Sequence, residues 1–129
     1  MRLLLDTHVL LCALDEPRQL SARATHLIRD PANAVLVSAA SAWEIATKHR
    51  LGKLPAAGPL INAYAAHLDT LRAEELPIRS THALRAGAFT VAHRDPFDRV
   101  LAAQSLLEGV PLLTNDSAFA AIADVETLW

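Results

Sequence analysis

The chain has one cysteine, no long apolar run and no excess of basic residues. A single cysteine cannot form an internal disulfide, which agrees with a reducing compartment, and we expect Cys12 to be a small core residue. No apolar run approaches the roughly 18 residues that span a bilayer, and polar residues interrupt the apolar start at once, from Asp6. We therefore predict a cytoplasmic protein without a membrane partner.

The charge balance is slightly acidic, with 12 Lys and Arg against 14 Asp and Glu and a net charge of −2. Proteins that bind nucleic acids usually carry a basic footprint, which this chain lacks overall. A nucleic acid would have to be held by a metal ion and by local basic clusters, of which the candidates are residues 48–50 with Lys53, and His93 and Arg94 with Arg99. Lysine and arginine also suit the C-terminal end of a helix, so both interpretations of the first cluster stay open.

Motifs of several common enzyme classes are missing. No GxGxxG and no GxxxxGK[ST] occurs, which argues against dinucleotide and P-loop nucleotide binding, and no GxSxG marks a serine hydrolase. The six histidines form no HExxH and no close pair at ligand spacing, and no cysteine cluster could hold zinc. We interpret most histidines as surface or helix residues, and only His93, beside an acidic motif, merits a test.

The 129 residues, 52% of them hydrophobic, suit one domain over residues 1–129 with a real core. Short apolar runs alternate with longer helical patterns. Strands are expected at residues 3–5, 34–37, 76–78, 110–113 and 125–128. Helices are expected at residues 8–14, from the cap Ser21 to about 29, and at 39–50, 59–71, 81–89 and 96–107, with one or two helical turns at 117–122. Such βαβ units predict an α/β fold with a parallel sheet covered on both faces.

Acidic residues follow the expected strands where parallel-sheet enzymes place their sites, at the carboxyl ends. Asp6 follows the first strand, Asp116 follows the strand at 110–113, and Glu44 lies in the helix after Ser38. Carboxylates gathered at one edge repel one another and need a compensating cation. Mg²⁺ is commonly held by one or two carboxylates with waters and a substrate phosphate, and such a site can activate a water.

Each acid also has a purely structural interpretation. Asp6 could cap the following helix, Asp116 sits in a Thr-Asn-Asp-Ser turn, and Glu44 and Lys48 have the i, i+4 spacing of a surface ion pair. A surface ion pair fits Glu44 less well, because this residue lies in an apolar segment. Its neighbour Trp43 is expected to be a core residue rather than a base-stacking platform.

The segment Asp95-Pro96-Phe97-Asp98 has the form of a helix start, with Asp95 at the N-cap and Pro96 at the first position. We favour the cap for Asp95, whereas for Asp98 a capping and a metal-binding role are both open. The segment before Asp95 reads poorly as a strand, so pattern alone does not bring Asp98 to the acidic edge.

Five short segments in order resemble one known family, the PIN-domain toxins of the VapC type. They are LLDTH at 4–8, SAASAWEI at 38–45, Lys48 with LGKL at 51–54, HRDPFDR at 93–99 and LTND at 113–116. Each is weak alone, but together they span nearly the whole chain at compatible spacing. The resemblance implies a three-layer α/β/α PIN-like fold with a parallel sheet of four or five strands.

The same resemblance implies the site. Mg²⁺, for which Mn²⁺ can substitute, would be held by Asp6 and Asp98, with Glu44 and the more variable Asp116 completing the catalytic acids. Accessory positions are Thr7, Ser41, Asp95 and Thr114, and Ser38 is a helix cap. A metal-activated water would cleave an RNA phosphodiester bond, leaving a 5′-phosphate and a 3′-hydroxyl. The resemblance also implies a homodimer and a cognate antitoxin protein that covers the site.

Two rival functions remain for comparison. An aspartyl-phosphate phosphatase needs a second acid two residues after its nucleophile, and His8 stands there instead. A catalytically silent PIN-like module could act only by binding RNA or protein, but loss of acids would mark it, and all the expected acids are present.

Overall fold

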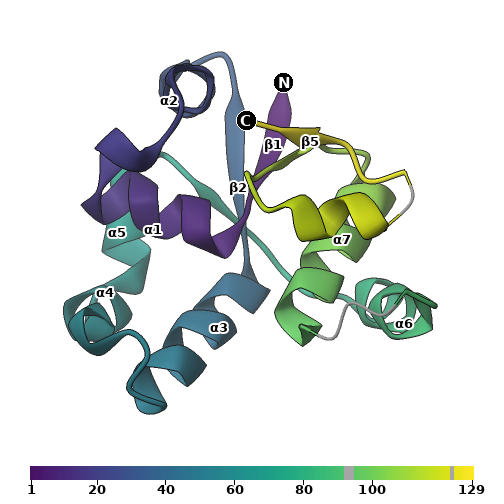
Figure 1. Ribbon diagram of the computed structural model, residues 1–129. Coiled ribbons are helices and arrows are strands. Elements are labelled where there is room, and N and C mark those ends of the chain that lie inside the picture. Colours follow the sequence, from purple (N-terminus) through teal and green to yellow (C-terminus); the bar gives the residue numbers. More distant parts are fainter. Residues whose placement is uncertain (92–94, 123) are drawn as a thin grey trace.

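A five-stranded parallel sheet forms the centre of the molecule, in the order β3-β2-β1-β4-β5 (Figure 1). The structure, a computed structural model, describes residues 1–91, 95–122 and 124–129. The strands are β1 (Arg2–Leu5), β2 (Ala34–Ser38), β3 (Glu74–Leu76), β4 (Leu112–Leu113) and β5 (Thr127–Leu128). The predicted parallel α/β architecture is confirmed.

Helices connect the strands and cover both faces of the sheet. They are α1 (Thr7–Asp15), α2 (Ala22–Arg29), α3 (Ala39–Arg50), α4 (Gly58–Asn62), α5 (Tyr64–Thr70), α6 (Ser80–Ala88) and α7 (Pro96–Glu108), with 3₁₀ turns η1 (Pro17–Gln19), η2 (Pro55–Ala57) and η3 (Ser117–Ala121). The hydroxyls of Ser21 and Ser38 accept the backbone N–H groups of Ala24 and Ala40, so both residues cap their helices as predicted. None of the helices in the described part of the chain is long and apolar enough to cross a membrane.

Alternate residues of the strands face two separate cores. Leu3 and Leu5 of β1 pack in one cluster with residues of α1, α2 and α5, whereas Leu4 packs in another with Leu101 of α7 and Phe119 of η3. Figure 1 shows α1, α2 and α5 on one side of the strands and α6 and α7 on the other. This is the predicted three-layer α/β/α arrangement. Cys12 is buried, as expected.

Several predicted boundaries are wrong, and the strands expected at 110–113 and 125–128 are shorter, covering Leu112–Leu113 and Thr127–Leu128. The single helix expected at 59–71 is divided into α4 and α5 at Ala63, whose backbone (φ −131°, ψ 39°) leaves the helical region although the leucine stripe continues through it. The strand expected at 76–78 lies earlier, at Glu74–Leu76, where it pairs with β2. Pro77 follows at once and has no N–H to donate to a ladder, which explains why the strand ends there.

Helix α3 links the two sides at the carboxyl edge of the sheet. It starts directly after β2, and Ala40 near its start packs with Val100 and Ala103 of α7. Ile45, farther along, belongs to the core cluster on the α1 side. The start of α3 and the start of α7 therefore meet beyond the ends of β1 and β4.

Candidate functional site

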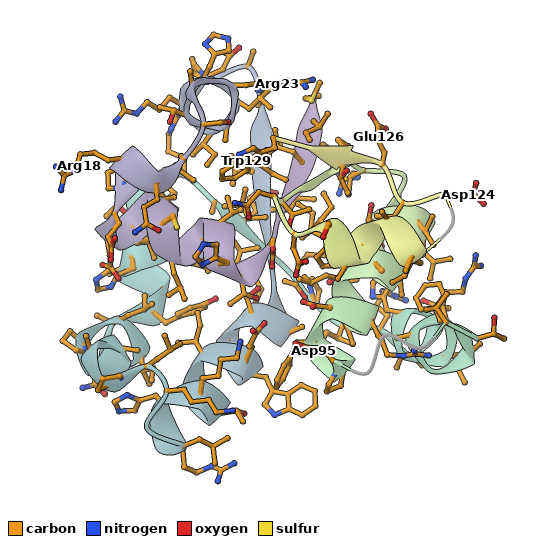
Figure 2. All side chains as sticks on the ribbon, in the orientation of Figure 1. Arg18, Arg23, Asp95, Asp124, Glu126 and Trp129 are labelled. Atoms are coloured by element: carbon orange, nitrogen blue, oxygen red, sulfur yellow. The ribbon has the colours of Figure 1, made fainter. Side chains whose placement is uncertain are left out.

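The predicted acids surround one pocket of about 350 Å³ at the carboxyl edge of the sheet. Its lining residues are Asp6, His8, Glu44, Lys48, Asp95, Asp98, Asn115 and Asp116. Figure 2 labels Asp95 where the start of α7 comes close to α3. Residues from the end of β1, from α3 and from the turn after β4 are thus brought together, as the strand ends predicted, and the start of α7 joins them, as the family resemblance implied.

Asp6 is buried and is held by the end of the neighbouring strand. It stands at the N-cap position of α1, but its side chain makes no capping hydrogen bond. Instead Thr114 Oγ1 donates to Asp6 Oδ2 at 2.7 Å, and the backbone N–H of Asp116 donates to Thr114 Oγ1 at 3.0 Å. Thr114 therefore positions the Asp6 carboxylate, which does more than stand at the cap of the helix that follows it.

Several effects shift the pKa of Asp6, and their sum raises it above its ordinary value of 3.8. Burial is the largest cause, and the negative charges of Glu44 and Asp116 add to it. The hydrogen bonds from Thr114 and from the backbone of His8 act in the opposite direction. An ionised Asp6 is thus costly in the folded chain, and a cation in the pocket would relieve that cost.

Glu44 and Lys48 form the predicted ion pair across one turn of α3. Glu44 is only 5% exposed, so this is a pair at the pocket wall and not the surface pair of the structural interpretation. Glu44 Oε2 accepts from Lys48 Nζ, while Oε1 is buried with no hydrogen-bond partner among the described residues. A buried carboxylate oxygen without a donor is costly and is suited to an incoming ligand or water.

The Lys48 ammonium stays charged beside the acids. Partial burial lowers its pKa, but the hydrogen bond to Glu44 and the charges of Glu44, Asp95 and Asp98 outweigh burial, so the pKa of Lys48 is raised above its ordinary 10.5. This lysine places a positive charge at an otherwise acidic pocket.

Asp95 and Asp116 combine structural roles with a place in the pocket wall. Asp95 Oδ1 accepts the backbone N–H groups of Phe97 and Asp98 at 2.9 and 3.4 Å, which confirms that it caps α7. Asp116 Oδ1 accepts from Ala118 N at 2.9 Å and caps η3. Both the turn and the pocket interpretations of Asp116 therefore hold.

Asp98 lies in the first turn of α7 and is 8% exposed.

The accessory positions Thr7 and Ser41 lie deeper. Their hydroxyl oxygens are 2.9 Å apart in a buried hydrogen bond that joins α1 to α3. This bond joins the helix that follows Asp6 to the helix that carries Glu44, and neither residue lines the acid pocket.

The donor set fits Mg²⁺. Among the described residues, no three His, Cys, Asp or Glu side chains stand close enough to enclose a metal by themselves. Mg²⁺ does not require such a cage, because it is usually bound by one or two carboxylates while waters and phosphate oxygens complete its shell. Asp6 and Asp98 at one pocket, with Glu44 in the same wall, meet that requirement.

No role was predicted for two lining residues, His8 and Asn115, although both lie in the motifs that carry the family resemblance. Each is a near neighbour of a predicted acid at a strand end, His8 of Asp6 and Asn115 of Asp116, and that adjacency was the available signal.

Trp43 and Arg99 differ from their predicted roles. Trp43 was expected in the core and this is wrong, because its side chain is 54% exposed. Arg99 was grouped with a basic cluster, but its guanidinium donates to the carbonyl oxygens of Ala86 and Phe89 at 2.9 and 2.6 Å and holds the end of α6. The rest of that cluster, residues 93 and 94, lies outside the described residues.

Comparison with known proteins places this chain in a family. The PIN domain model matches residues 3–125. Ribonuclease VapC16 of Mycobacterium tuberculosis (strain ATCC 25618 / H37Rv) is 58% identical over 33 residues, a match that spans 26% of this chain and only 23% of that relative.

Three solved structures share the fold over almost the whole chain. VapBC2 from Rickettsia felis, bound to a DNA fragment from their promoter, has a TM-score of 0.68 at 15% identity and covers 99% of this chain and 98% of that one. VapBC-1 from nontypeable Haemophilus influenzae has a TM-score of 0.69 at 19% identity, covering 99% and 97%. FitAcB from Neisseria gonorrhoeae has a TM-score of 0.63 at 24% identity, covering 98% and 96%. At these identities the likeness shows the fold, and the family model, which matches nearly every residue, shows that the chain belongs to the PIN domain family.

Proposed function

We propose that this chain is a metal-dependent endoribonuclease and the toxin component of a type II toxin–antitoxin pair. One observation carries the proposal: five carboxylates from distant parts of the sequence, Asp6, Glu44, Asp95, Asp98 and Asp116, line a single pocket that holds one lysine. Keeping so many acids together is unfavourable unless a further cation binds there, so the arrangement is better explained by function than by stability.

Mg²⁺, with Mn²⁺ as a substitute, would be held by Asp6 and Asp98. When bound, the ion lowers the pKa of a water and neutralises charge on a phosphodiester. Glu44 Oε1, which has no partner among the described residues, would accept a proton from the attacking water. Lys48 would attract the phosphate and so help a chain of net charge −2 to hold RNA.

The partner part of the proposal rests on the neighbouring structures, two of which are described as VapBC assemblies. A second pocket, of about 280 Å³, shares His8 with the acid pocket and is lined by α1 and residues 53–57. Leu11, Leu54 and Pro55 give it apolar walls, which suit a segment of an antitoxin that lies across the acids. We propose a homodimer as the active form, and a cytoplasmic location.

The nuclease proposal is tested with the purified chain and total RNA, in Mg²⁺, Mn²⁺ or EDTA, with fragment ends mapped by sequencing. We expect discrete cuts that leave 5′-phosphates, disappear in EDTA and are lost in Asp98→Asn. Asp69→Asn, at an exposed position of α5, is the matched control and should cut normally. RNA from the native host that is bound but left intact by both the wild type and Asp98→Asn would favour the silent binding module instead.

The toxin proposal is tested separately in cells. Induced expression of the wild type should arrest growth, Asp98→Asn should not, and co-expression of the short reading frame next to the gene should relieve the arrest. Unimpaired growth with cuts in vitro would indicate a general RNA-processing enzyme.

A further inference from the structure

An aromatic pair joins the two helices that supply acids to the pocket. Trp43 of α3 precedes Glu44, and Phe97 of α7 precedes Asp98, so each helix carries an aromatic residue followed by a pocket acid. The two rings meet edge to face, with centroids 4.6 Å apart and planes at 79°. The pair thus bridges the starts of the two helices that supply Glu44 and Asp98.

The two rings differ in exposure. Phe97 is only 9% exposed, whereas Trp43 is 54% exposed. In an edge-to-face pair the partner covers at most one face of the indole, so Phe97 leaves the other face uncovered. Phe97 also restrains the indole, and a ring that is already fixed loses little freedom when a ligand stacks on it.

Exposed apolar side chains are common and need no special explanation when they stand alone. Trp43 does not stand alone, because its neighbour in the chain is a wall residue of the pocket that would bind the scissile phosphate. A strand whose phosphate enters that pocket would carry its adjacent bases past the indole.

We infer that Trp43 is a stacking platform for an unpaired base next to the scissile phosphate, an inference that rests on the proposed nuclease function. Bases in a duplex are already stacked on both faces, so the platform selects single-stranded RNA. Stacking tolerates any base and does not depend on positive charge, which suits a chain without a basic footprint.

The first test compares variants of Trp43 that keep an apolar side chain against Phe97. One of them lacks a flat aromatic ring and two retain one. Trp43→Leu keeps an apolar cover but cannot stack, and we expect KM for a short single-stranded RNA to rise about 10-fold with kcat nearly unchanged. Trp43→Phe and Trp43→Tyr should recover most of that loss. Leu84→Ala, which removes another exposed apolar residue from α6, is the control and should leave KM unchanged.

An abasic site in the substrate makes the test specific. Removing the base next to the cut should raise the KM of the wild type about 10-fold. It should have little effect on the KM of Trp43→Leu, because the stacking interaction is already lost there. Equal losses in both proteins would overturn the inference.

Binding can be measured without cleavage. The chain has two tryptophans, so Trp129→Phe leaves Trp43 as the only one, and Asp98→Asn prevents cutting. We expect single-stranded RNA to quench the fluorescence of Trp43, and duplex RNA of the same sequence to quench it much less. Quenching without any metal-dependent cleavage by the wild type would support the platform and refute the nuclease.

Two results would overturn the platform while leaving the nuclease intact. One is cleavage by Trp43→Leu with an unchanged KM. The other is Trp43 fluorescence that does not change on addition of RNA but changes with protein concentration, together with a dimer that dissociates in Trp43→Leu. A second copy of the chain would then cover the indole.

Discussion

Thr114 Oγ1 donates a 2.7 Å hydrogen bond to Asp6 Oδ2 and so joins the ends of β4 and β1 across 108 positions of the sequence. The same oxygen accepts the backbone N–H of Asp116 at 3.0 Å. A single buried hydroxyl therefore orients one pocket acid and fixes the backbone of another. It also opposes the rise in the pKa of Asp6 that burial causes.

Thr114→Val should weaken metal binding. Valine has nearly the same shape but can neither donate to Asp6 nor accept from Asp116. Loss of a hydrogen bond that orients a metal ligand typically costs about 10- to 100-fold in affinity. We expect the Mg²⁺ concentration for half-maximal cleavage to rise by that factor. Thr127→Val, at an exposed position of the adjacent strand β5, is the control, and an equal Mg²⁺ dependence in both variants would refute the role of Thr114.

Lys48→Met should lower both stability and activity. The substitution leaves buried Glu44 without its ion-pair partner. Because the Lys48 side chain is 39% exposed, we expect a loss of only about 1 kcal/mol in the free energy of unfolding without metal, measured by urea denaturation. Cleavage should fall about 10-fold, since the positive charge is lost from the phosphate site, and Lys48→Arg should retain most of it.

The other lysine of the chain provides the matched control for this prediction. Lys53 lines the second pocket and not the acid pocket, so Lys53→Met should leave stability and cleavage nearly unchanged. Equal effects of the two substitutions would show that Lys48 acts only through the net charge of the protein.

Asp6→Asn should stabilise the metal-free protein while abolishing its response to metal. The raised pKa of Asp6 means that its charged form is disfavoured in the fold, and an amide removes that charge while still accepting from Thr114. We expect a gain of roughly 1 kcal/mol at neutral pH without metal, seen as a higher melting temperature. Mg²⁺ should raise the melting temperature of the wild type but not of Asp6→Asn. A variant that is still stabilised by Mg²⁺ would exclude Asp6 as a ligand.

Tyr64→Phe should change the alkaline stability of the fold. The Tyr64 hydroxyl is buried without a hydrogen-bond partner among the described residues, and burial raises its pKa from 10.0 to about 12. The unfolded chain therefore loses this proton first, so its contribution to stability is complete below pH 10 and is lost as pH rises toward about 12.

Phenylalanine has no proton to lose, so the variant should show a weaker fall in stability over that pH range. Removing an unsatisfied hydroxyl should also be neutral or stabilising by up to about 1 kcal/mol at pH 7. Urea denaturation at a series of pH values measures both effects, and a parallel fall in the two proteins would refute the assignment to Tyr64.

The gathering of the acids could be predicted from the sequence because it depends on a simple rule of topology. Residues that follow parallel strands meet at one edge, which placed Asp6 and Asp116 together without any knowledge of contacts. Asp98 was harder, because no strand precedes it closely, and only the family resemblance brought it to the pocket.

The remaining features depend on packing that local patterns do not record. Ala63 interrupts a leucine stripe that would suit one continuous helix, and alanine carries no signal of a break. Trp43 looked like a core residue because tryptophan is usually buried, whereas its exposure depends on where α7 places Phe97. The partnership of Thr114 with Asp6 likewise needs the strand order, since the two residues lie at opposite ends of the chain.

The central claim is that the acid pocket binds the metal that RNA cleavage requires. The most direct measurement is the single-turnover rate of cutting a mapped RNA across a Mg²⁺ titration, for the wild type, Asp98→Asn and the control Asp69→Asn. We expect saturable Mg²⁺ dependence in the wild type and the control, and a rate at least about 100-fold lower in Asp98→Asn at every concentration. Equal rates in wild type and Asp98→Asn, or cleavage that persists in EDTA, would contradict it.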